Sequence, residues 1–323
     1  IIQGTSFLDV KILGYRDHVG RVHLNNVAPF IDLRNVPPSI YSFDNCYILR
    51  DRPVSFREAP EVLENATINQ GYLIFSIRGC PFSCTYCVNN ALKESFKNSG
   101  NILRYSSLEG GLQELEHGMQ HISNMKWVRF NEDDFFIRSK EALETFCVQF
   151  KKRINLPIMF SATFRNMTPE KLDILIKSEI KINRIKFGIQ SGSHWTNRVI
   201  YKRNFNPKII KARLDYLFKK KIYVVIDLIS LNPFESDRER SETASFLFDL
   251  LNEVYYKDRK AMKKYVYLLD HKLIFYPGTQ MYELAVEKNM IGNNYIQEVL
   301  FRRDRWRKKW EIDAELLAIS AFN

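Results

Sequence analysis

The sequence lacks any long hydrophobic run. Apolar residues make up 45% of its 323 residues, and no apolar stretch approaches the roughly 20 residues that cross a bilayer. The charged fraction, 26%, is ordinary for a globular chain. The length is sufficient for one large domain or two smaller ones. No membrane-spanning helix is therefore expected, and a folded chain with a sizeable core is.

Cysteine is also scarce. There are five cysteines, three of them clustered within eight positions, and this distribution does not make a disulfide framework. We therefore expect a reducing compartment, the cytoplasm. No signal peptide is recognisable, and the first residue is Ile1 rather than Met, so we expect the sequence to start inside a longer protein.

Positive charge is in excess. The net charge is +11, which allows a polyanionic partner such as RNA, although a solvated basic surface is the simpler interpretation. The sharpest basic patch covers residues 302–309. Trp306 and Trp310 within and beside it would suit stacking on bases, but also docking of an amphipathic helix. RNA is therefore an open partner and not the favoured one.

Six apolar segments alternate with helix signals between residues 67 and 292. The helix starts are marked by Ser106, Ser139, Thr168, Asn206 and Ser236, whose side chains can cap helices. The alternation predicts a parallel sheet with crossover helices, whose site lies at the carboxyl ends of the strands. The predicted strands are 72–78, 126–130, 157–161, 185–190, 223–229 and 272–276.

The two ends of the chain are expected to lie outside this core. Residues 1–66 are interpreted as a linker and the remnant of an upstream domain, with short strands at 10–13 and 22–24. Paired prolines predict an extended linker over Asp32–Pro38. Residues 293–323 are predicted to form a helical extension.

Three cysteines follow the first predicted strand directly. Cys80, Cys84 and Cys87 have the spacing Cys-x3-Cys-x2-Cys. Three thiolates on one loop can hold a metal centre but are one ligand short of a closed tetrahedral site. A zinc site would need a fourth ligand, and no Cys or His lies close after Cys87. The open position favours a catalytic centre that binds substrate or cofactor there.

With Tyr86 in the aromatic position, this loop resembles the cluster loop of the radical S-adenosylmethionine (radical SAM) enzymes. The resemblance implies that Cys80, Cys84 and Cys87 hold three irons of a [4Fe–4S] cluster and that SAM chelates the fourth. It also implies an α/β fold, a partial (β/α)6 TIM-like barrel over residues 67–292. An external reductant of the flavodoxin or ferredoxin type would supply the electron.

The resemblance extends to other strand ends. Glu132 and Asp133 match the segment that touches the SAM amino group by position and acidity only, because the usual Gly-Gly-Glu is absent. The segment 190–193, Gln-Ser-Gly-Ser, resembles the family segment that reaches the ribose and carboxylate of SAM. The implied cofactor contacts are Tyr86, Glu132, Asp133, Ser161, Gln190, Ser191, Ser193 and Pro277. The sequence identifies no residue that acts on the substrate.

A finer resemblance is to the cobalamin-binding subgroup. It rests on local strings that include Arg129–Phe135, Tyr201-Lys202-Arg203 and the segment that begins at Phe275. It implies cobalamin-dependent methyl transfer to an unknown small-molecule or peptide substrate. The cobalamin-ligating motif Asp-x-His-x-x-Gly is missing, and Asp17-His18-Val19-Gly20 has the wrong spacing. Cobalamin therefore stays open as a cofactor.

Two other hypotheses are kept beside this one. The chain could be an RNA-modifying radical SAM enzyme, similar to a methylthiotransferase, that uses the basic C-terminal patch. It could instead be a non-catalytic binding module with a structural metal. His117 and His121 lie four residues apart, but exposed or semi-packed histidines are the favoured interpretation. Cys147 is expected in the core.

Overall fold

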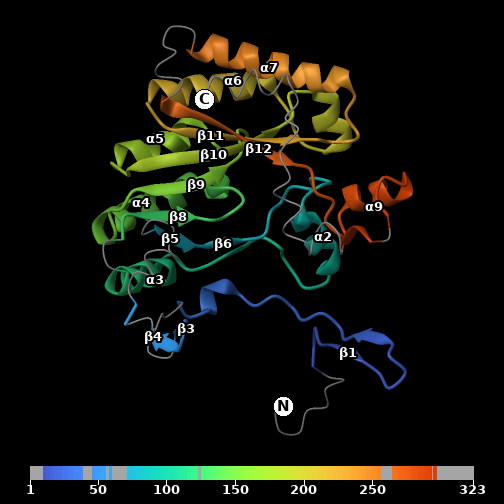
Figure 1. Cartoon of the computed structure of the whole chain (residues 1–323). Helices are drawn as coiled ribbons and strands as arrows, with labels where there is room; N and C mark the ends of the chain where they lie inside the picture. Colours follow the sequence, from blue (N-terminus) through green and yellow to red (C-terminus); the bar gives the residue numbers. More distant parts are fainter. Residues whose placement is uncertain are drawn as a thin grey trace.

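A computed structural model describes residues 10–38, 46–55, 58–59, 71–122, 125–255, 264–292 and 294–296. Six parallel strands form its central sheet, in the order β12-β11-β10-β9-β8-β5 (Figure 1). Their bounds are Gly71–Ile74 (β5), Trp127–Phe130 (β8), Ile158–Ala162 (β9), Ile182–Gln190 (β10), Val224–Ser230 (β11) and Val266–Lys272 (β12). The predicted α/β fold is confirmed, and this sheet is the open sheet of a partial TIM-like barrel. No helix within the described ranges is long and apolar enough to span a membrane.

Helices connect the strands in succession. They are α3 (Leu108–His121), α4 (Lys140–Arg153), α5 (Pro169–Lys177), α6 (Pro207–Lys219) and α7 (Asp237–Tyr255). Two more, α2 (Val88–Ser95) and α9 (Gln280–Glu287), lie beside the carboxyl ends of the strands (Figure 1). The parallel order therefore brings loops that are distant in the sequence to one edge of the sheet.

The predicted helix starts are confirmed with one exception. Ser139, Thr168 and Asn206 accept hydrogen bonds from backbone N–H groups in the first turns of their helices. For α3 the prediction of Ser106 is wrong, because the side chain of Ser107 accepts from the Gly110 N–H instead. The backbone N–H of Ser106 donates to the carbonyl of Ser76 and so belongs to the preceding loop.

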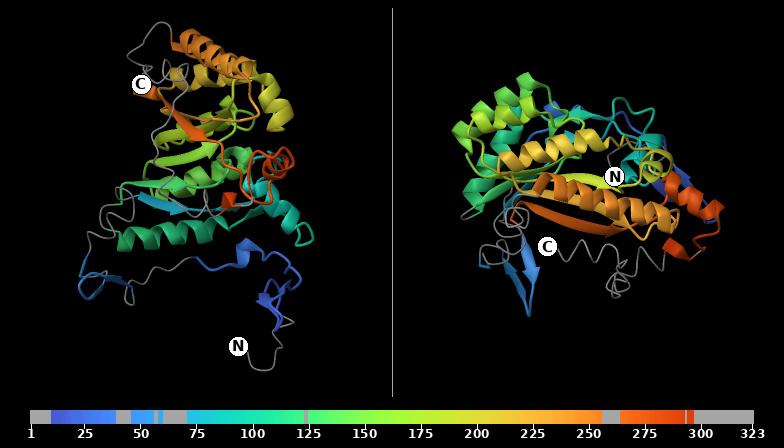
Figure 2. Two further views of the ribbon diagram at one scale, coloured as in Figure 1. Left: turned by 45° about the vertical axis from the view of Figure 1, so that its right-hand side comes forward. Right: turned by 90° about the horizontal axis from the view of Figure 1, so that it is seen from above.

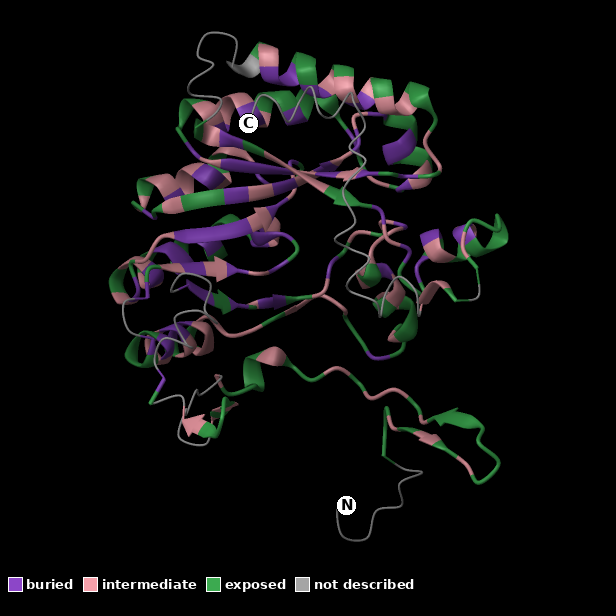
Figure 3. Ribbon diagram, viewed as in Figure 1, coloured by how far each residue is buried: buried purple, intermediate pink, exposed green. Residues whose placement is uncertain are grey.

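One face of the sheet packs against these helices and forms the main core. Alternate strand residues supply it, because successive side chains of a strand point to opposite faces. Figure 3 shows these buried residues on the strands and on the inner sides of the helices. Cys147 is fully buried there, as expected. The sheet contributes Val128, Phe130, Ile158, Phe160, Ile185, Phe187, Val224 and Ile226 among others.

Two predicted strands are corrected. The segment 72–78 forms two strands, β5 and β6 (Ile77–Arg78), and β6 pairs antiparallel with β7 (Arg104–Tyr105). The sixth strand is β12, which ends where the predicted segment 272–276 begins. In that segment Leu273 and Phe275 are buried in a second cluster outside the sheet, and this burial explains the alternating apolar pattern.

The segment before the barrel lies beyond the β5 edge of the sheet (Figure 2). It contains a hairpin of β1 (Gly14–Arg16) and β2 (Val22–Leu24), and a second one of β3 (Tyr47–Leu49) and β4 (Pro53–Ser55). The strand expected at 10–13 is therefore wrong, whereas 22–24 is confirmed. The expected linker is extended except for a 3-10 turn, Leu33–Asn35. The domain boundaries stay predictions, and residues 297–323 lie outside the described residues.

Candidate active site

The entry to the cysteine loop requires glycine at position 79. Gly79 has φ +88°, a conformation that side chains with a Cβ rarely adopt. A Cβ there would also overlap the backbone carbonyl of Ile102. The chain can therefore turn from β6 into Cys80 only because Gly79 carries no side chain.

Thr85 fixes the middle of the loop between two distant segments. Its N–H donates to the Tyr201 carbonyl at 3.1 Å, and its hydroxyl donates to the Ile200 carbonyl at 2.6 Å. Its own carbonyl accepts from the N–H of Met281, in α9, at 3.0 Å. The thiols on either side of Thr85 are therefore held by backbone contacts from both sides.

Arg203 connects the loop to β10. Its guanidinium donates to the Tyr86 hydroxyl at 2.8 Å, to the Gly188 carbonyl at 2.7 Å and to the Cys84 sulfur at 3.7 Å. The Tyr86 ring packs edge-on against Tyr201, with centroids 4.9 Å apart. The aromatic position of the motif is thus a packing and hydrogen-bonding residue of the loop.

The three thiols are withdrawn from solvent to different degrees. Cys80 is buried, and Cys84 and Cys87 are half-buried. Burial raises the pKa of Cys80 to about 12, and the charges of Asp133, Cys87 and Cys84 add to this effect. Burial likewise raises the pKa of Cys87, with Cys84 and Asp133 contributing. Thiolates so placed are stabilised by positive charge, which bound iron would supply.

The spacing of these thiols differs from that of a single-ion site. Across the described ranges, no three His, Cys, Asp or Glu side chains are arranged to hold one metal ion. In a [4Fe–4S] cluster each cysteine binds a different iron, so its thiols need not converge on one point. Three thiols on a fixed loop therefore fit a cluster, with one iron left for another ligand.

Glu132 is the second residue after β8. One of its carboxylate oxygens accepts several hydrogen bonds, and the other accepts none. Its Oε1 accepts from the N–H and hydroxyl of Ser76 and from Arg138 Nη2 at 2.9 Å. Both side chains of the ion pair are buried, with exposures of 1% for Glu132 and 9% for Arg138. Its Oε2 is buried and has no hydrogen-bond partner. A buried acceptor without a donor is costly unless a ligand supplies one.

The next two acids have different surroundings. Asp133 is exposed and bonds the side chain of Asn89 in α2, while burial of the surrounding site and the charge of Glu132 raise its pKa. Asp134 is buried and accepts from Thr163 Oγ1 at 2.7 Å and Asn166 Nδ2 at 2.8 Å. Asp133 therefore faces the cysteine loop, and Asp134 connects its loop to the segment after β9.

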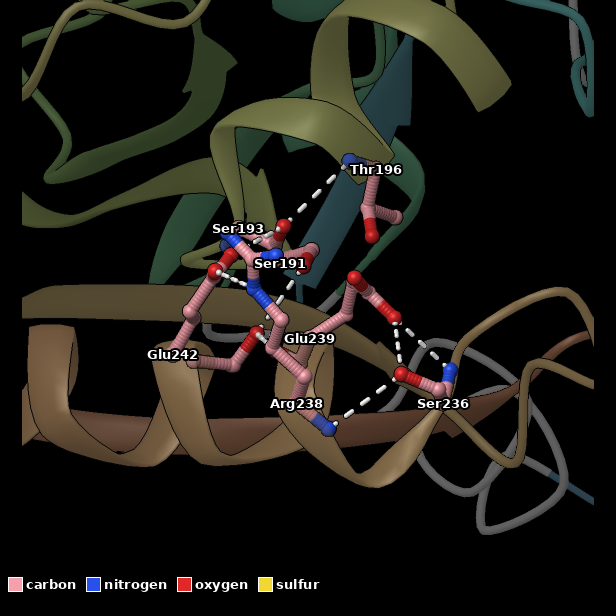
Figure 4. A network of polar contacts seen from close by, with 8 residues as sticks. Ser191, Ser193, Thr196, Ser236, Arg238, Glu239 and Glu242 are labelled. Carbon is pink, nitrogen blue, oxygen red and sulfur yellow. Dashed lines mark hydrogen bonds and ion pairs between the residues drawn. The ribbon is translucent and has the colours of Figure 1, made fainter.

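Ser191 and Ser193, after β10, use their hydroxyls within the protein. Ser191 Oγ donates to Glu235 Oε1 at 2.9 Å and lies 2.9 Å from Thr243 Oγ1. Ser193 Oγ donates to Glu242 Oε2 at 2.7 Å (Figure 4). Figure 4 also shows Ser236 and Glu239 in the predicted capping box. The two serines attach the end of β10 to α7, a role that the sequence did not predict.

The remaining expected contacts lie at their predicted strand ends. Ser161 is half-buried in β9, and Pro277 is exposed just before α9. Gln190 ends β10 with φ +70°, and its amide folds back over Gly188, where a Cβ would collide with it. Whether these side chains contact SAM stays a prediction.

The sequence interpretation missed Arg203 as a site residue. Only its string, Tyr201-Lys202-Arg203, suggested it, and no spacing rule relates it to a cysteine 119 positions away. The signal that could have found it is the loop after the fourth strand, because all such loops meet at one edge of the sheet.

The sequence pattern of the Radical SAM superfamily matches residues 74–247, more than half of the chain. The chain belongs to the radical SAM superfamily. It is therefore a radical SAM enzyme, and enzymes of this superfamily cleave SAM at a [4Fe–4S] cluster with an electron from a reductant. The enzyme hypothesis is thus confirmed over the binding module.

Solved structures support the same fold at low sequence identity. One is the cobalamin-dependent SAM radical enzyme OxsB, with 17% identity and a TM-score of 0.62 over 89% of this chain and 43% of that one. Another is the radical SAM methyltransferase TsrM from Kitasatospora setae, with 13% identity and a TM-score of 0.61 over 88% of this chain and 50% of that one. The chain thus spans half or less of these proteins. No curated protein sequence matches it.

Proposed function

We propose that Cys80, Cys84 and Cys87 bind the [4Fe–4S] cluster and that the acids after β8 receive the SAM amino group. When bound, the cluster supplies the electron that cleaves SAM to methionine and a 5′-deoxyadenosyl radical. The protein's own contribution is to fix the three thiols and to leave one iron accessible. The clamping of the loop by Thr85 and Gly79 supports this assignment.

The observation that carries the SAM assignment is the unpartnered Oε2 of Glu132. SAM has an ammonium group and a sulfonium, and both are cations that a carboxylate attracts. Arg138 and Ser76 fix Glu132 through Oε1, so Oε2 keeps its orientation without the ligand. An ammonium at this point would supply the missing donor in a site of low dielectric, where charge-assisted hydrogen bonds are strong.

Arg203 complements the thiols of the cluster loop. Its hydrogen bond to the Cys84 sulfur places a positive charge beside the cluster loop. A guanidinium keeps its charge at all ordinary pH values, so Arg203 adds a fixed positive charge beside the Cys84 sulfur. Its bonds to Tyr86 and Gly188 hold this group in place.

For the reaction subtype we propose cobalamin-dependent methyl transfer or a related radical modification. The similarity to OxsB and TsrM covers 88–89% of the chain, beyond the 74–247 segment common to the superfamily. No residue of this sequence supplies the Asp-x-His-x-x-Gly ligand. Asp17 instead forms the turn of the β1–β2 hairpin, accepting from the N–H groups of Val19 and Arg21. The cobalamin part therefore rests on fold similarity and on the local sequence strings, and not on a cobalamin ligand in this sequence.

Metal analysis tests the ligand assignment. The protein is reconstituted anaerobically with iron and sulfide, beside Cys84→Ala and, as a matched control, Cys147→Ala, which removes a buried thiol from the core. We expect four irons per chain for the parent and for Cys147→Ala, and a clear loss for Cys84→Ala. Full iron retention by Cys84→Ala would contradict the assignment.

Cobalamin binding tests the subtype separately. The full-length protein is mixed with hydroxocobalamin and passed through a desalting column. Methyl transfer of the proposed kind predicts retained cobalamin absorbance in proportion to protein. Complete loss of the absorbance would remove the subtype and leave the cluster assignment untouched. The basic patch 302–309, which motivated an RNA substrate, lies outside the described residues.

A further inference from the structure

The face of the sheet opposite the helices carries an unusual concentration of positive charge. Side chains that alternate with the main core point to this inner face. Arg129, Arg184 and Lys186 are among them, together with a single acid, Asp227. A face built mainly for packing would carry apolar side chains, so these cations require another explanation.

Two of the cations lie at the same register position on the two strands that flank β9. Arg129 in β8 and Arg184 in β10 are both register partners of Met159 in β9. Met159 is 5% exposed, and its sulfur accepts from Arg184 Nε at 3.1 Å. Arg129 and Arg184 thus lie on the two strands that flank Met159, and the Arg184 guanidinium contacts its sulfur. Burial and the charge of Arg184 lower the pKa of Arg129, and the charge of Asp227 offsets part of this shift.

The acid of this face is already paired elsewhere. Asp227 contacts Lys186 Nζ at 2.8 Å through one oxygen and His271 Nε2 at 3.2 Å through the other. Among the described residues, no carboxylate lies within ion-pair distance of Arg129 or Arg184. Asp227 acts on Arg129 only from a longer distance, and Arg184 is exposed, so an anion between the two guanidinium groups would still lower their mutual repulsion.

We propose that Arg129 and Arg184 bind an oxyanion group of the substrate, either a phosphate or a carboxylate. This inference rests on the proposed function, because it names the substrate class of the same barrel. Arg129 precedes Glu132 by three residues, roughly 10 Å along an extended chain. A substrate anchored at Arg129 can therefore extend to the strand ends where the radical forms. The planar donor pairs of arginine suit bidentate contacts with such oxyanions.

Thermal unfolding and calorimetry with pyrophosphate and succinate as probes test this site in the full chain, against sodium chloride of equal ionic strength. The variants are Arg129→Met, Arg184→Met and Arg184→Lys, and the control is Arg52→Met, an exposed arginine outside the barrel.

We expect the parent and Arg52→Met to bind a probe and to unfold at a higher temperature with it. Each Met variant should weaken binding at least tenfold, and Arg184→Lys should be intermediate. Without a probe, the Met variants should unfold at the same or a higher temperature, because a repulsion is removed.

Three results would overturn the oxyanion site. The first is no probe binding by the parent beyond the chloride reference. The second is an equal loss of probe affinity in Arg52→Met and in the two Met variants, and the third is a lower unfolding temperature of the Met variants without any probe. Cys84→Ala separates this inference from the proposed function. It should bind the probes like the parent while losing SAM cleavage. Probe binding without SAM cleavage by the parent contradicts the function, and cleavage without probe binding contradicts only the oxyanion site.

Discussion

The carboxyl ends of β8 and β10 carry polar side chains at the same edge of the sheet. The two sets differ in how much of their hydrogen-bonding capacity is left for a ligand. After β8, Glu132 keeps one buried oxygen without a partner, and Asp133 faces the cysteine loop. After β10, the hydroxyls of Ser191 and Ser193 are taken by side chains at and within α7. A polar residue at a strand end is therefore a ligand candidate only where its hydrogen-bonding capacity is left unfilled.

The difference follows from what packs beside each strand end. The β8 end faces the cysteine loop and α2. The side chain of Asn89, in α2, forms a hydrogen bond with Asp133. The β10 end lies under α7, which supplies Glu242 and Thr243. We therefore expect substitutions at the β8 end to change SAM binding and those at the β10 serines to change mainly stability.

The largest expected effect is that of Glu132→Gln. It removes one partner of a buried ion pair and should lower the free energy of unfolding by about 3 kcal/mol. It also removes the charge that faces the SAM ammonium, so the Kd for SAM should rise at least tenfold. The matched control is Asp134→Asn on the same loop, where all expected loss is in stability. Equal SAM affinity in Glu132→Gln and the parent, measured by equilibrium dialysis, would break the comparison.

A substitution that moves the cysteine loop should have the next largest effect. Gly79→Ala introduces a positive-φ penalty of about 1–2 kcal/mol and a collision with Ile102. Gly100→Ala is the control, because Gly100 has φ +107° and nothing near its Cβ position. Chemical denaturation and iron content should show a larger loss for Gly79→Ala than for Gly100→Ala. Identical iron content in both variants would mean that the loop entry does not set the thiol positions.

The smallest effects are expected from Ser191→Ala and Ser193→Ala. Each removes a hydrogen bond to a carboxylate and should cost about 1–2 kcal/mol in the free energy of unfolding. The Kd for SAM should stay within about twofold of the parent. A tenfold weaker SAM affinity at unchanged stability would show that these hydroxyls contact the cofactor, as the family resemblance implies.

Much of the fold could be predicted because it depends on local patterns. The strands at 126–130, 157–161, 185–190 and 223–229 alternate toward the core and lie within a few residues of their predicted bounds. The segment 272–276 has the same alternation but packs against Tyr201 instead of pairing in the sheet. Periodicity shows which side chains are buried and does not show against what they are buried.

The site was predictable at the level of loops and not of contacts. The cysteine spacing identified the loop that we propose to bind the cluster, and the strand order placed 131–134 and 190–193 at the same sheet edge. The partners of Ser191 lie 44 and 52 residues away, and Arg203 lies 119 residues from Cys84. Such contacts depend on how α7 and the loop after β10 pack, which no local pattern encodes.

Formation of 5′-deoxyadenosine tests the central claim most directly. The reconstituted protein is incubated with SAM and dithionite, and the product is quantified by chromatography beside Cys84→Ala and Cys147→Ala. We expect 5′-deoxyadenosine from the parent and from Cys147→Ala, and none above background from Cys84→Ala. Equal product from Cys84→Ala and the parent would contradict the assignment of the cluster to the loop of Cys80, Cys84 and Cys87.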